Sequence, residues 1–316
     1  MEKIKLGSSG LEVAPLALGT NVFGWTINEQ QSFKILDAFT GAGCNLVDTA
    51  DVYSRWGNGN KGGESETIIG YWLKKTGKRK DIVLATKVGS DMGSGKRDLS
   101  KEYILKAAED SLKRLQTDHI DLYQTHFDDN ITPVEETLEA YAQLVKEGKV
   151  IAIGASNISP ERLKESIETS HSKGLPVYQT LQPQYNLCER EGYEKNYEQI
   201  CIDNDLGVIC YFPLASGFLT GKYRTESDLS KSIRGEGVRK YMNDRGLNIL
   251  STLDEIAAEH VATPATIALA WLIARKSVTA PIASATNTEQ LDELIKAANL
   301  TLDEDAIYRL NNASNY

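Results

Sequence analysis

The chain has 316 residues and a formal net charge of −9, with 41% hydrophobic and 25% charged residues, as in ordinary globular proteins. The negative charge argues against nonspecific binding to nucleic acids or anionic membranes. No apolar run reaches the roughly 18 residues of a membrane span, and the N-terminus lacks the apolar core of a signal peptide, so we expect a cytoplasmic protein.

The cysteines and histidines show none of the spacings typical of disulfide frameworks or metal sites. The four cysteines form no Cys-x-x-Cys pair, and the four histidines form no His-x-His or His-Glu-x-x-His motif. We therefore expect reduced cysteines and no bound metal.

Short apolar runs typical of buried strands alternate with amphipathic stretches along nearly the whole chain. Residues 3–13 come first and predict a small hairpin with a glycine-containing turn. The predicted strands are Pro15–Leu18, Asn45–Val47, Ile82–Thr86, Ile120–Thr125, Val150–Gly154, Val177–Leu181, Gly207–Phe212 and Ala280–Ala283.

Helical patterns fill the intervals between these strands. The predicted helices are Glu29–Thr40, Glu64–Lys75, Lys101–Leu115, Pro133–Glu147, Ser159–Ser172, Glu191–Asp205, Pro264–Arg275 and Thr288–Ala298. The predicted N-caps are Ser100, Thr132, Ser159 and Thr263, three of them followed by a proline, and the predicted C-terminal stops are Gly148 and Gly174.

Eight strands alternating with eight helices favour an α/β fold, a single (β/α)8 TIM barrel over residues 1–316. An open doubly wound sheet is the alternative, but it requires a Gly-x-Gly-x-x-Gly turn after the first strand, where the sequence reads Leu-Gly-Thr-Asn. Residues 215–246 form a long loop after strand seven, and loops of that length are usually functional.

Polar side chains stand at the ends of three consecutive predicted strands. Asp48 follows the second strand, Lys87 the third and His126 the fourth, while Tyr53 lies in the loop after Asp48. Each alone could be a turn, surface or core residue. Together they should converge on the carboxyl-end rim of a barrel, where such folds place their chemistry.

Longer segments carry a specific resemblance. They are NLVDTADVYS, GGESETIIG, VLATKVG, SLKRLQTDHIDLYQTH, LVKEGKVIAIGASN, LQPQYN and YFPLASGFLTGKY. In these motifs and their order the chain resembles the aldo-keto reductases, from about residue 3 to residue 300.

The resemblance implies a catalytic tetrad of Asp48, Tyr53, Lys87 and His126. In such a tetrad a nicotinamide cofactor supplies hydride to a carbonyl carbon and Tyr53 donates the proton. Lys87 would lower the pKa of Tyr53, Asp48 would hold Lys87, and His126 would orient the carbonyl group.

Cofactor contacts are implied in the same way. Ser156, Asn157 and Gln182 would bond to the nicotinamide carboxamide, Tyr211 would stack on the ring, and residues 214–222 would form the pyrophosphate loop. The full expected set is Gly19, Thr20, Asn21, Ser156, Asn157, Gln182, Tyr211, Pro213, Leu214, Ala215, Gly217, Leu219, Gly221, Lys222, Ser284, Thr286 and Gln290.

The chain departs from the family pattern after strand eight. Many relatives have an arginine there that meets the 2′-phosphate of NADP, whereas this chain has Thr286, which with Ser284 and Gln290 offers no positive charge. The loop after strand seven could compensate through Arg234, Arg239 or Lys240. We expect NADPH as the cofactor, with NADH possible.

The substrate pocket is expected to be lined by Phe23, Trp25, Trp56, Phe127 and Asp128, beside Tyr53. This mixture suits a small carbonyl compound such as an aldehyde or aldose. The leading hypothesis is an NAD(P)H-dependent reductase of aldehydes and ketones, with no nucleic-acid or membrane partner and an oligomeric state that the sequence does not indicate.

Three alternatives differ from this hypothesis. An NAD-dependent oxidative sugar or alcohol dehydrogenase would suit the missing arginine. A cofactor-binding regulatory subunit resembling channel β subunits would share the fold, although the chain shows no disordered N-terminal extension. A metal-dependent barrel hydrolase would need clusters of histidines and carboxylates that the sequence lacks.

Overall fold

The computed structural model describes residues 1–232 and 235–316. In this part of the chain, eight parallel strands form one sheet in the order β10-β3-β4-β5-β6-β7-β8-β9. Their bounds are β3 (Ala17–Gly19), β4 (Leu46–Asp48), β5 (Val83–Val88), β6 (Ile120–Thr125), β7 (Val150–Ser156), β8 (Thr180–Gln182), β9 (Gly207–Val208) and β10 (Ile282–Ala283).

Backbone hydrogen bonds join the two ends of this sheet. The amide groups of Thr279 and Ala280 donate to the carbonyl oxygen of Val208 over 2.8 and 3.1 Å, and Ile282 N donates to Cys210 O over 2.9 Å. The sheet therefore curls round on itself, and the predicted (β/α)8 class is confirmed.

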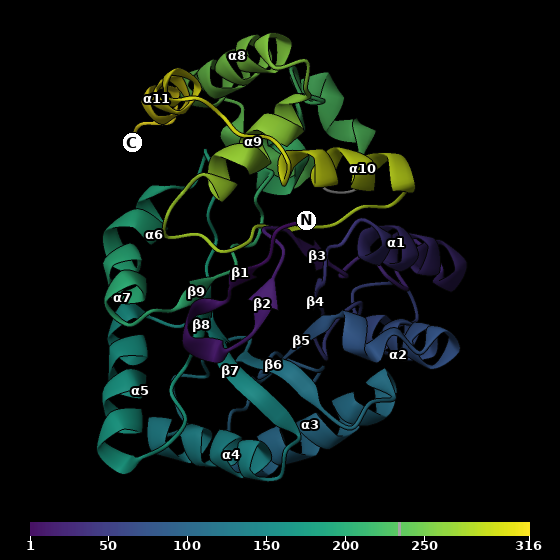
Figure 1. Cartoon of the computed structure of the whole chain (residues 1–316), viewed down its shortest axis with the longest axis vertical. Helices are drawn as coiled ribbons and strands as arrows, with labels where there is room; N and C mark the ends of the chain where they lie inside the picture. The colour runs from purple at the N-terminus through teal and green to yellow at the C-terminus, as the bar shows by residue number, and fades with distance from the viewer. Residues whose placement is uncertain (233–234) are drawn as a thin grey trace.

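Helices surround the strands, as Figure 1 shows. Their bounds are α1 (Glu29–Gly41), α2 (Glu64–Thr76), α3 (Lys101–Leu115), α4 (Val134–Lys146), α5 (Pro160–Lys173), α6 (Glu191–Asn196), α7 (Glu198–Asp203), α8 (Asp244–Glu259), α9 (Pro264–Ile273), α10 (Thr288–Ala297) and α11 (Glu304–Ala313). Two of them, α8 and α11, are absent from the prediction, and the helix predicted over 191–205 is interrupted at Tyr197, where φ is −125°.

Most of the predicted helix ends are confirmed. The side chains of Ser100, Ser159 and Thr263 each accept a backbone amide hydrogen in the first turn of a helix. The prediction for Thr132 is wrong, because α4 begins one residue later with Pro133 as its cap. Thr132 Oγ1 instead donates to Asp129 Oδ2 over 2.6 Å.

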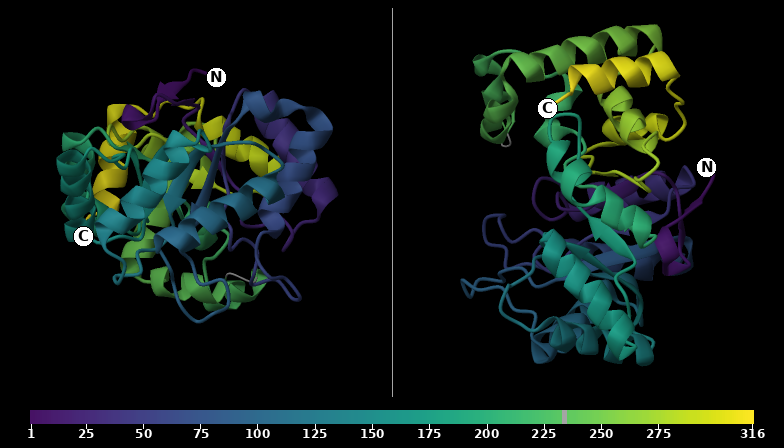
Figure 2. Two further views of the ribbon diagram at one scale, coloured as in Figure 1. Left: turned by 90° about the horizontal axis from the view of Figure 1, so that it is seen from below. Right: turned by 90° about the vertical axis from the view of Figure 1, so that its left-hand side faces the viewer.

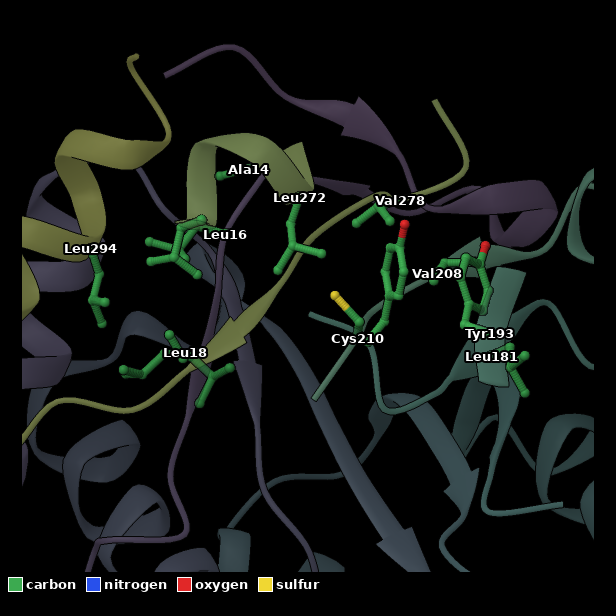
Figure 3. Packing of buried hydrophobic residues seen from close by; sticks show 14 of the residues in the cluster. Ala14, Leu16, Leu18, Leu181, Tyr193, Val208, Cys210, Leu272, Val278 and Leu294 are labelled. Atoms are coloured by element: carbon green, nitrogen blue, oxygen red, sulfur yellow. The ribbon is translucent and has the colours of Figure 1, made fainter. Parts of the chain in front are cut away.

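The core has two layers because side chains alternate along each strand. One cluster fills the barrel interior, and its members are Leu6, Val13, Ala17, Leu46, Val83, Ala85, Leu122, Ala152, Ile209, Ala280 and Ile282. The other cluster lies between strands and helices. Leu16 and Leu18, on either side of Ala17, belong to this outer layer together with Leu272 and Leu294 (Figure 3).

The predicted hairpin is present and covers one end of the barrel. Strands β1 (Ile4–Lys5) and β2 (Glu12–Val13) pair antiparallel. Leu6 is fully buried in the interior cluster, and Ser8 N donates to Asp205 O over 3.0 Å. The hairpin and the long loops after β4 and β5 lie on opposite sides of the barrel (Figure 2, right).

The long connection after β9 contains short 3-10 helices. They are η3 (Ala215–Thr220), η4 (Glu226–Lys231) and η5 (Gly235–Tyr241). Among the described residues no single helix has the length and apolar composition to cross a membrane, and only the pair α8 and α9, bent by 94°, meets both requirements jointly.

Candidate active site

The candidate tetrad lies in the top interior layer of the barrel. Leu46 and Ala85 point inward, so Asp48 and Lys87, two residues further along their strands, point to the same side. Asp48 is the last residue of β4 and pairs with Ala85 of β5. Lys87 lies two residues further along β5, and its side chain reaches back to Asp48.

Lys87 uses all three of its donors. Its Nζ donates to Asp48 Oδ2 over 2.6 Å, to Thr49 O over 2.8 Å and to Tyr53 Oη over 3.1 Å. The Lys87 and Asp48 side chains are 0% and 2% exposed. The three side chains therefore form one connected unit shielded from solvent.

The pKa values of this unit follow from burial and charge. Burial opposes the charge on Lys87, but Asp48 and Tyr53 outweigh burial, and the pKa of Lys87 is raised. Burial raises the pKa of Tyr53 above its ordinary value, and the positive charge of Lys87 only partly offsets this rise. Tyr53 thus holds its proton at neutral pH, as a proton donor must.

His126 completes the group at the end of β6. Its ring is 5.8 Å from the Tyr53 ring, edge to face. Burial, followed by the charges of Lys87 and Arg97, holds the pKa of His126 well below its usual range, so the imidazole is neutral. Its Nδ1 is buried without a hydrogen-bond partner among the described residues.

A residue that the sequence analysis did not identify supports Asp48 from the other side. Gln124 Nε2 and Gln182 Nε2 both donate to Asp48 Oδ1, over 3.3 and 3.0 Å. Gln124 is fully buried in β6, two residues after the inward-pointing Leu122. An amide side chain on the inward-pointing face of β6, two positions before His126, is the pattern that could have identified it.

The residues expected at the nicotinamide lie together and bond to one another. Ser156 Oγ donates to Gln182 O over 2.8 Å, and Asn157 Nδ2 donates to Ser156 Oγ and His126 O over 3.0 and 2.8 Å. Tyr211 Oη donates to Asn157 Oδ1 over 3.0 Å. Asn157 thereby links the loop after β7 to both His126 and the Tyr211 ring.

The expected pyrophosphate segment has an unusual backbone. Phe212, Ala215, Ser216 and Gly217 all have positive φ, between 48° and 95°. Such a backbone can turn successive amide groups toward an anion. The apolar side chains of this stretch face inward: Leu214 is half-buried, and the buried ones are Pro213, Ala215 and Leu219. Lys222 is exposed, and its ammonium group lies 3.3 Å from a β-carbon placed on Gly217. Gly221 ends η3 with φ 78°.

At the end of β3, Gly19 leaves no room for a side chain, because a β-carbon there would lie 2.9 Å from Ile282 Cγ2 and Ser284 Oγ. Thr20 is buried and bonds to Asp48 O, while Ser284 Oγ donates to Asn21 Oδ1 over 2.7 Å. These contacts join the loops after β3 and β10.

Of the three cations expected to compensate at Thr286, the two that the structure describes are paired with carboxylates. Thr286 N and Oγ1 both donate to Gln290 Oε1, over 2.9 and 3.0 Å. Arg239 is paired with Glu226 and Glu236, and Lys240 with Glu189. Arg234 lies outside the described residues.

Of the residues expected to line the substrate pocket, three form an accessible aromatic group. Trp56 is 47% exposed and packs edge-on against Trp25 and Tyr53, and Phe127 stacks on His126 at 4.8 Å. Two others are enclosed. Phe23 is fully buried in the outer core, and the Asp128 carboxylate, 4% exposed, is paired with Arg162 at 3.0 Å.

Comparisons with known proteins agree with this architecture. The profile of the aldo/keto reductase family matches residues 15–315. The chain is 37% identical to the uncharacterized oxidoreductase YrpG of Bacillus subtilis (strain 168), over 98% of this chain and 95% of that protein.

Two further relatives are each 32% identical to this chain. They are L-glyceraldehyde 3-phosphate reductase of Escherichia coli O157:H7, over 96% of this chain and 90% of the relative, and a probable voltage-gated potassium channel subunit beta of Arabidopsis thaliana, over 95% and 92%. With the family profile matched across nearly its whole length, the chain belongs to the aldo/keto reductase family and is an oxidoreductase.

Proposed function

We propose that this enzyme reduces aldehydes or ketones to alcohols with NADPH, and that Tyr53 is the proton donor. The observation that carries the proposal is the buried contact of Tyr53 Oη with Lys87 Nζ, which is itself held by Asp48. The family generally uses NADP(H) for carbonyl reduction, which supports the same reaction here.

The role of each side chain follows from its surroundings. Tyr53 has a protonated phenol, and the adjacent Lys87 ammonium stabilises the phenolate left after proton transfer. Asp48 fixes the ammonium in place, and Gln124 and Gln182 fix Asp48. The neutral His126 would donate a hydrogen bond to the carbonyl oxygen and polarise it.

Residues around the tetrad fit a nicotinamide dinucleotide. Tyr211 is held by Asn157 and would present a ring face, and the positive-φ segment from Phe212 to Gly217, with Lys222 beside it, suits a pyrophosphate. When bound, the nicotinamide supplies the hydride. The buried, water-poor tetrad would keep the proton for the substrate oxygen.

The preference for NADPH over NADH is part of the proposal. Thr286, Gln290 and Ser284 would contact the 2′-phosphate through hydroxyl and amide groups alone, because Arg239 and Lys240 are already paired. Comparing kcat/KM with the two cofactors tests it. A preference for NADH of about tenfold or more, roughly 1.4 kcal/mol, would reverse the assignment and favour an oxidative NAD-dependent dehydrogenase.

The substrate would be a small carbonyl compound that reaches Tyr53 past the Trp25 and Trp56 rings. One relative is named as a reductase of a three-carbon aldehyde phosphate, which makes short hydroxylated aldehydes a suitable starting panel. Absence of turnover on such a panel, together with tight NADPH binding, would instead favour the alternative of a cofactor-binding regulatory subunit; one relative is named as a probable channel subunit.

The decisive experiment compares the unmodified enzyme with Tyr53→Phe. We expect kcat for aldehyde reduction to fall by about a hundredfold or more, because the general acid is lost. NADPH affinity, followed by quenching of tryptophan fluorescence, should change little. Tyr308→Phe, which removes the same hydroxyl group from an exposed tyrosine on α11, is the matched control for the loss of a phenol. An unaffected kcat in Tyr53→Phe would refute the assigned role.

A further inference from the structure

Two arginines on the rim above the tetrad form no ion pair with a carboxylate of the described residues. They are Arg55, two residues after Tyr53, and Arg97, on the loop between β5 and α3. Every other arginine in the described ranges pairs with a carboxylate or, like Arg245, donates to several backbone carbonyl groups. In a chain of net charge −9, two guanidinium groups outside the ion pairs of the described residues, beside the candidate active site, are a distinctive local feature.

Arg97 is held next to His126 by an aromatic ring. Its guanidinium carbon lies 4.4 Å from the Phe127 ring centroid, and Phe127 stacks on His126 at 4.8 Å. One weak bond, from Arg97 Nη1 to Asp128 O over 3.4 Å, uses a single donor of the group. The stacking orients a planar guanidinium whose remaining donors are free for a ligand.

The acidic side chains on this rim are occupied elsewhere. Asp91 accepts the amide hydrogens of Gly93 and Gly95, and these bonds, followed by the nearby charge of Arg55, lower its pKa. Asp98 accepts the amide hydrogen of Ser100. Asp128 is paired with Arg162, and Asp129 accepts from Leu99, Ile131 and Thr132. None of them is within ion-pair distance of Arg97.

Arg55 approaches the same loop from its other side. A β-carbon placed on Gly93 would lie 2.7 Å from Arg55 Nη2, so the absence of a side chain at Gly93 lets the guanidinium rest against the backbone. The loop after β4, which also carries the exposed Trp56, and the loop after β5 thus each present an arginine.

We propose that Arg97, assisted by Arg55, binds an anionic group on the substrate, so that the preferred substrates are aldehydes carrying a carboxylate or a phosphate. The inference rests on the proposed function, because the carbonyl end must reach Tyr53 and His126. An arginine beside an aromatic wall suits a planar or tetrahedral oxyanion, which it binds by two hydrogen bonds at once.

The test uses matched pairs of aldehydes. One pair is 4-oxobutanoate and butanal, and the other is glyceraldehyde 3-phosphate and glyceraldehyde, so that the two arms separate carboxylate from phosphate recognition. We expect the unmodified enzyme to favour the anionic member of at least one pair in kcat/KM by about tenfold or more, as for a hydrogen bond to a charged group. This preference should shrink as salt concentration rises.

The variant Arg97→Gln should lose about 10- to 100-fold in kcat/KM for the preferred anionic aldehyde, mainly through KM, and change little with its neutral counterpart. Arg97→Lys should retain part of the preference. Arg309→Gln removes the same charge on α11 and is the control for net charge.

The outcomes separate the two hypotheses. Turnover of neutral and anionic aldehydes without preference in either pair overturns this inference and leaves the proposed function standing. Equal losses on neutral and anionic aldehydes in Arg97→Gln also overturn it. Absence of turnover in both pairs overturns the proposed function and this inference together.

Discussion

Asp51, between Asp48 and Tyr53 in the sequence, is a buried carboxyl group without a partner. It is 2% exposed, and neither of its carboxylate oxygens has a hydrogen-bond partner among the described residues. Burial and the negative charge of the fully buried Glu66 raise the pKa of Asp51 to about 8, despite the opposing charges of Arg114 and Lys87. Asp51 is therefore a neutral acid at pH 7.

This shift makes the free energy of unfolding depend on pH. In the unfolded chain an aspartate has a pKa of about 3.9, so a folded pKa near 8 corresponds to a penalty of roughly 5 kcal/mol once the group is ionised. Because the pKa of Asp51 is raised in the folded state, its contribution to the free energy of unfolding is fully present below about pH 4. That contribution decreases as the pH rises from 4 to 8 and is fully lost above about pH 8.

The variant Asp51→Asn keeps a neutral polar group of the same shape at every pH. It should unfold with the same free energy as the unmodified enzyme near pH 4 and be more stable at pH 9. Water entry and local relaxation reduce the ideal value, so we expect a difference of at least about 2 kcal/mol between pH 5 and pH 9.

Urea unfolding at pH 5, 7 and 9 measures this difference, with both proteins at equal ionic strength. Asp203→Asn, which removes an exposed carboxylate from α7, is the matched control and should show no such trend. A stability difference for Asp51→Asn that stays constant from pH 5 to pH 9 would refute the assignment of a neutral buried acid.

Two further predictions concern stability. Lys87→Met leaves the Asp48 carboxylate buried without its cation and should lower the free energy of unfolding by about 3–5 kcal/mol. Lys195→Met breaks an exposed ion pair on α6 and should lower it by less than about 1 kcal/mol. Similar losses for the two variants in urea unfolding would contradict the argument. Gly70→Ala places a methyl group on the Arg114 carbonyl oxygen where α2 packs on α3 and should destabilise by about 1–3 kcal/mol. Gly192→Ala, in open space on α6, should stabilise by about 0.5–1 kcal/mol, and thermal unfolding that ranks the two glycine variants the other way would rule out the packing explanation.

The fold was predictable because its strands and helices have different local patterns. The apolar runs of β5 and β6 and the proline-capped starts of α5 and α9 are visible in short windows of sequence. Helix α8 was missed because it begins at Asp244, inside a polar stretch that was assigned to the long loop. Its helical pattern nevertheless lies within a short window, because Ile249, Leu253 and Ile256 recur at helical spacing.

The grouping of the tetrad side chains was predictable, and their environment was less so. Strand ends place Asp48 and Lys87 together whatever the surrounding side chains are. The pKa of Tyr53 is different, because the sequence shows the cation that lowers it and does not show the burial that raises it more. The same applies to Phe23 and Asp128, whose enclosure depends on residues far away in the chain, such as Arg162.

The hairpin at the closed end of the barrel has a consequence for how the chain is made. Gly7 packs against Gly207, and Ser8 bonds to Asp205, so these partners are separated by some two hundred residues of chain. During synthesis the hairpin is therefore made long before the residues it contacts. Until β9 has been made, Leu6 is an apolar side chain that lacks part of its binding site.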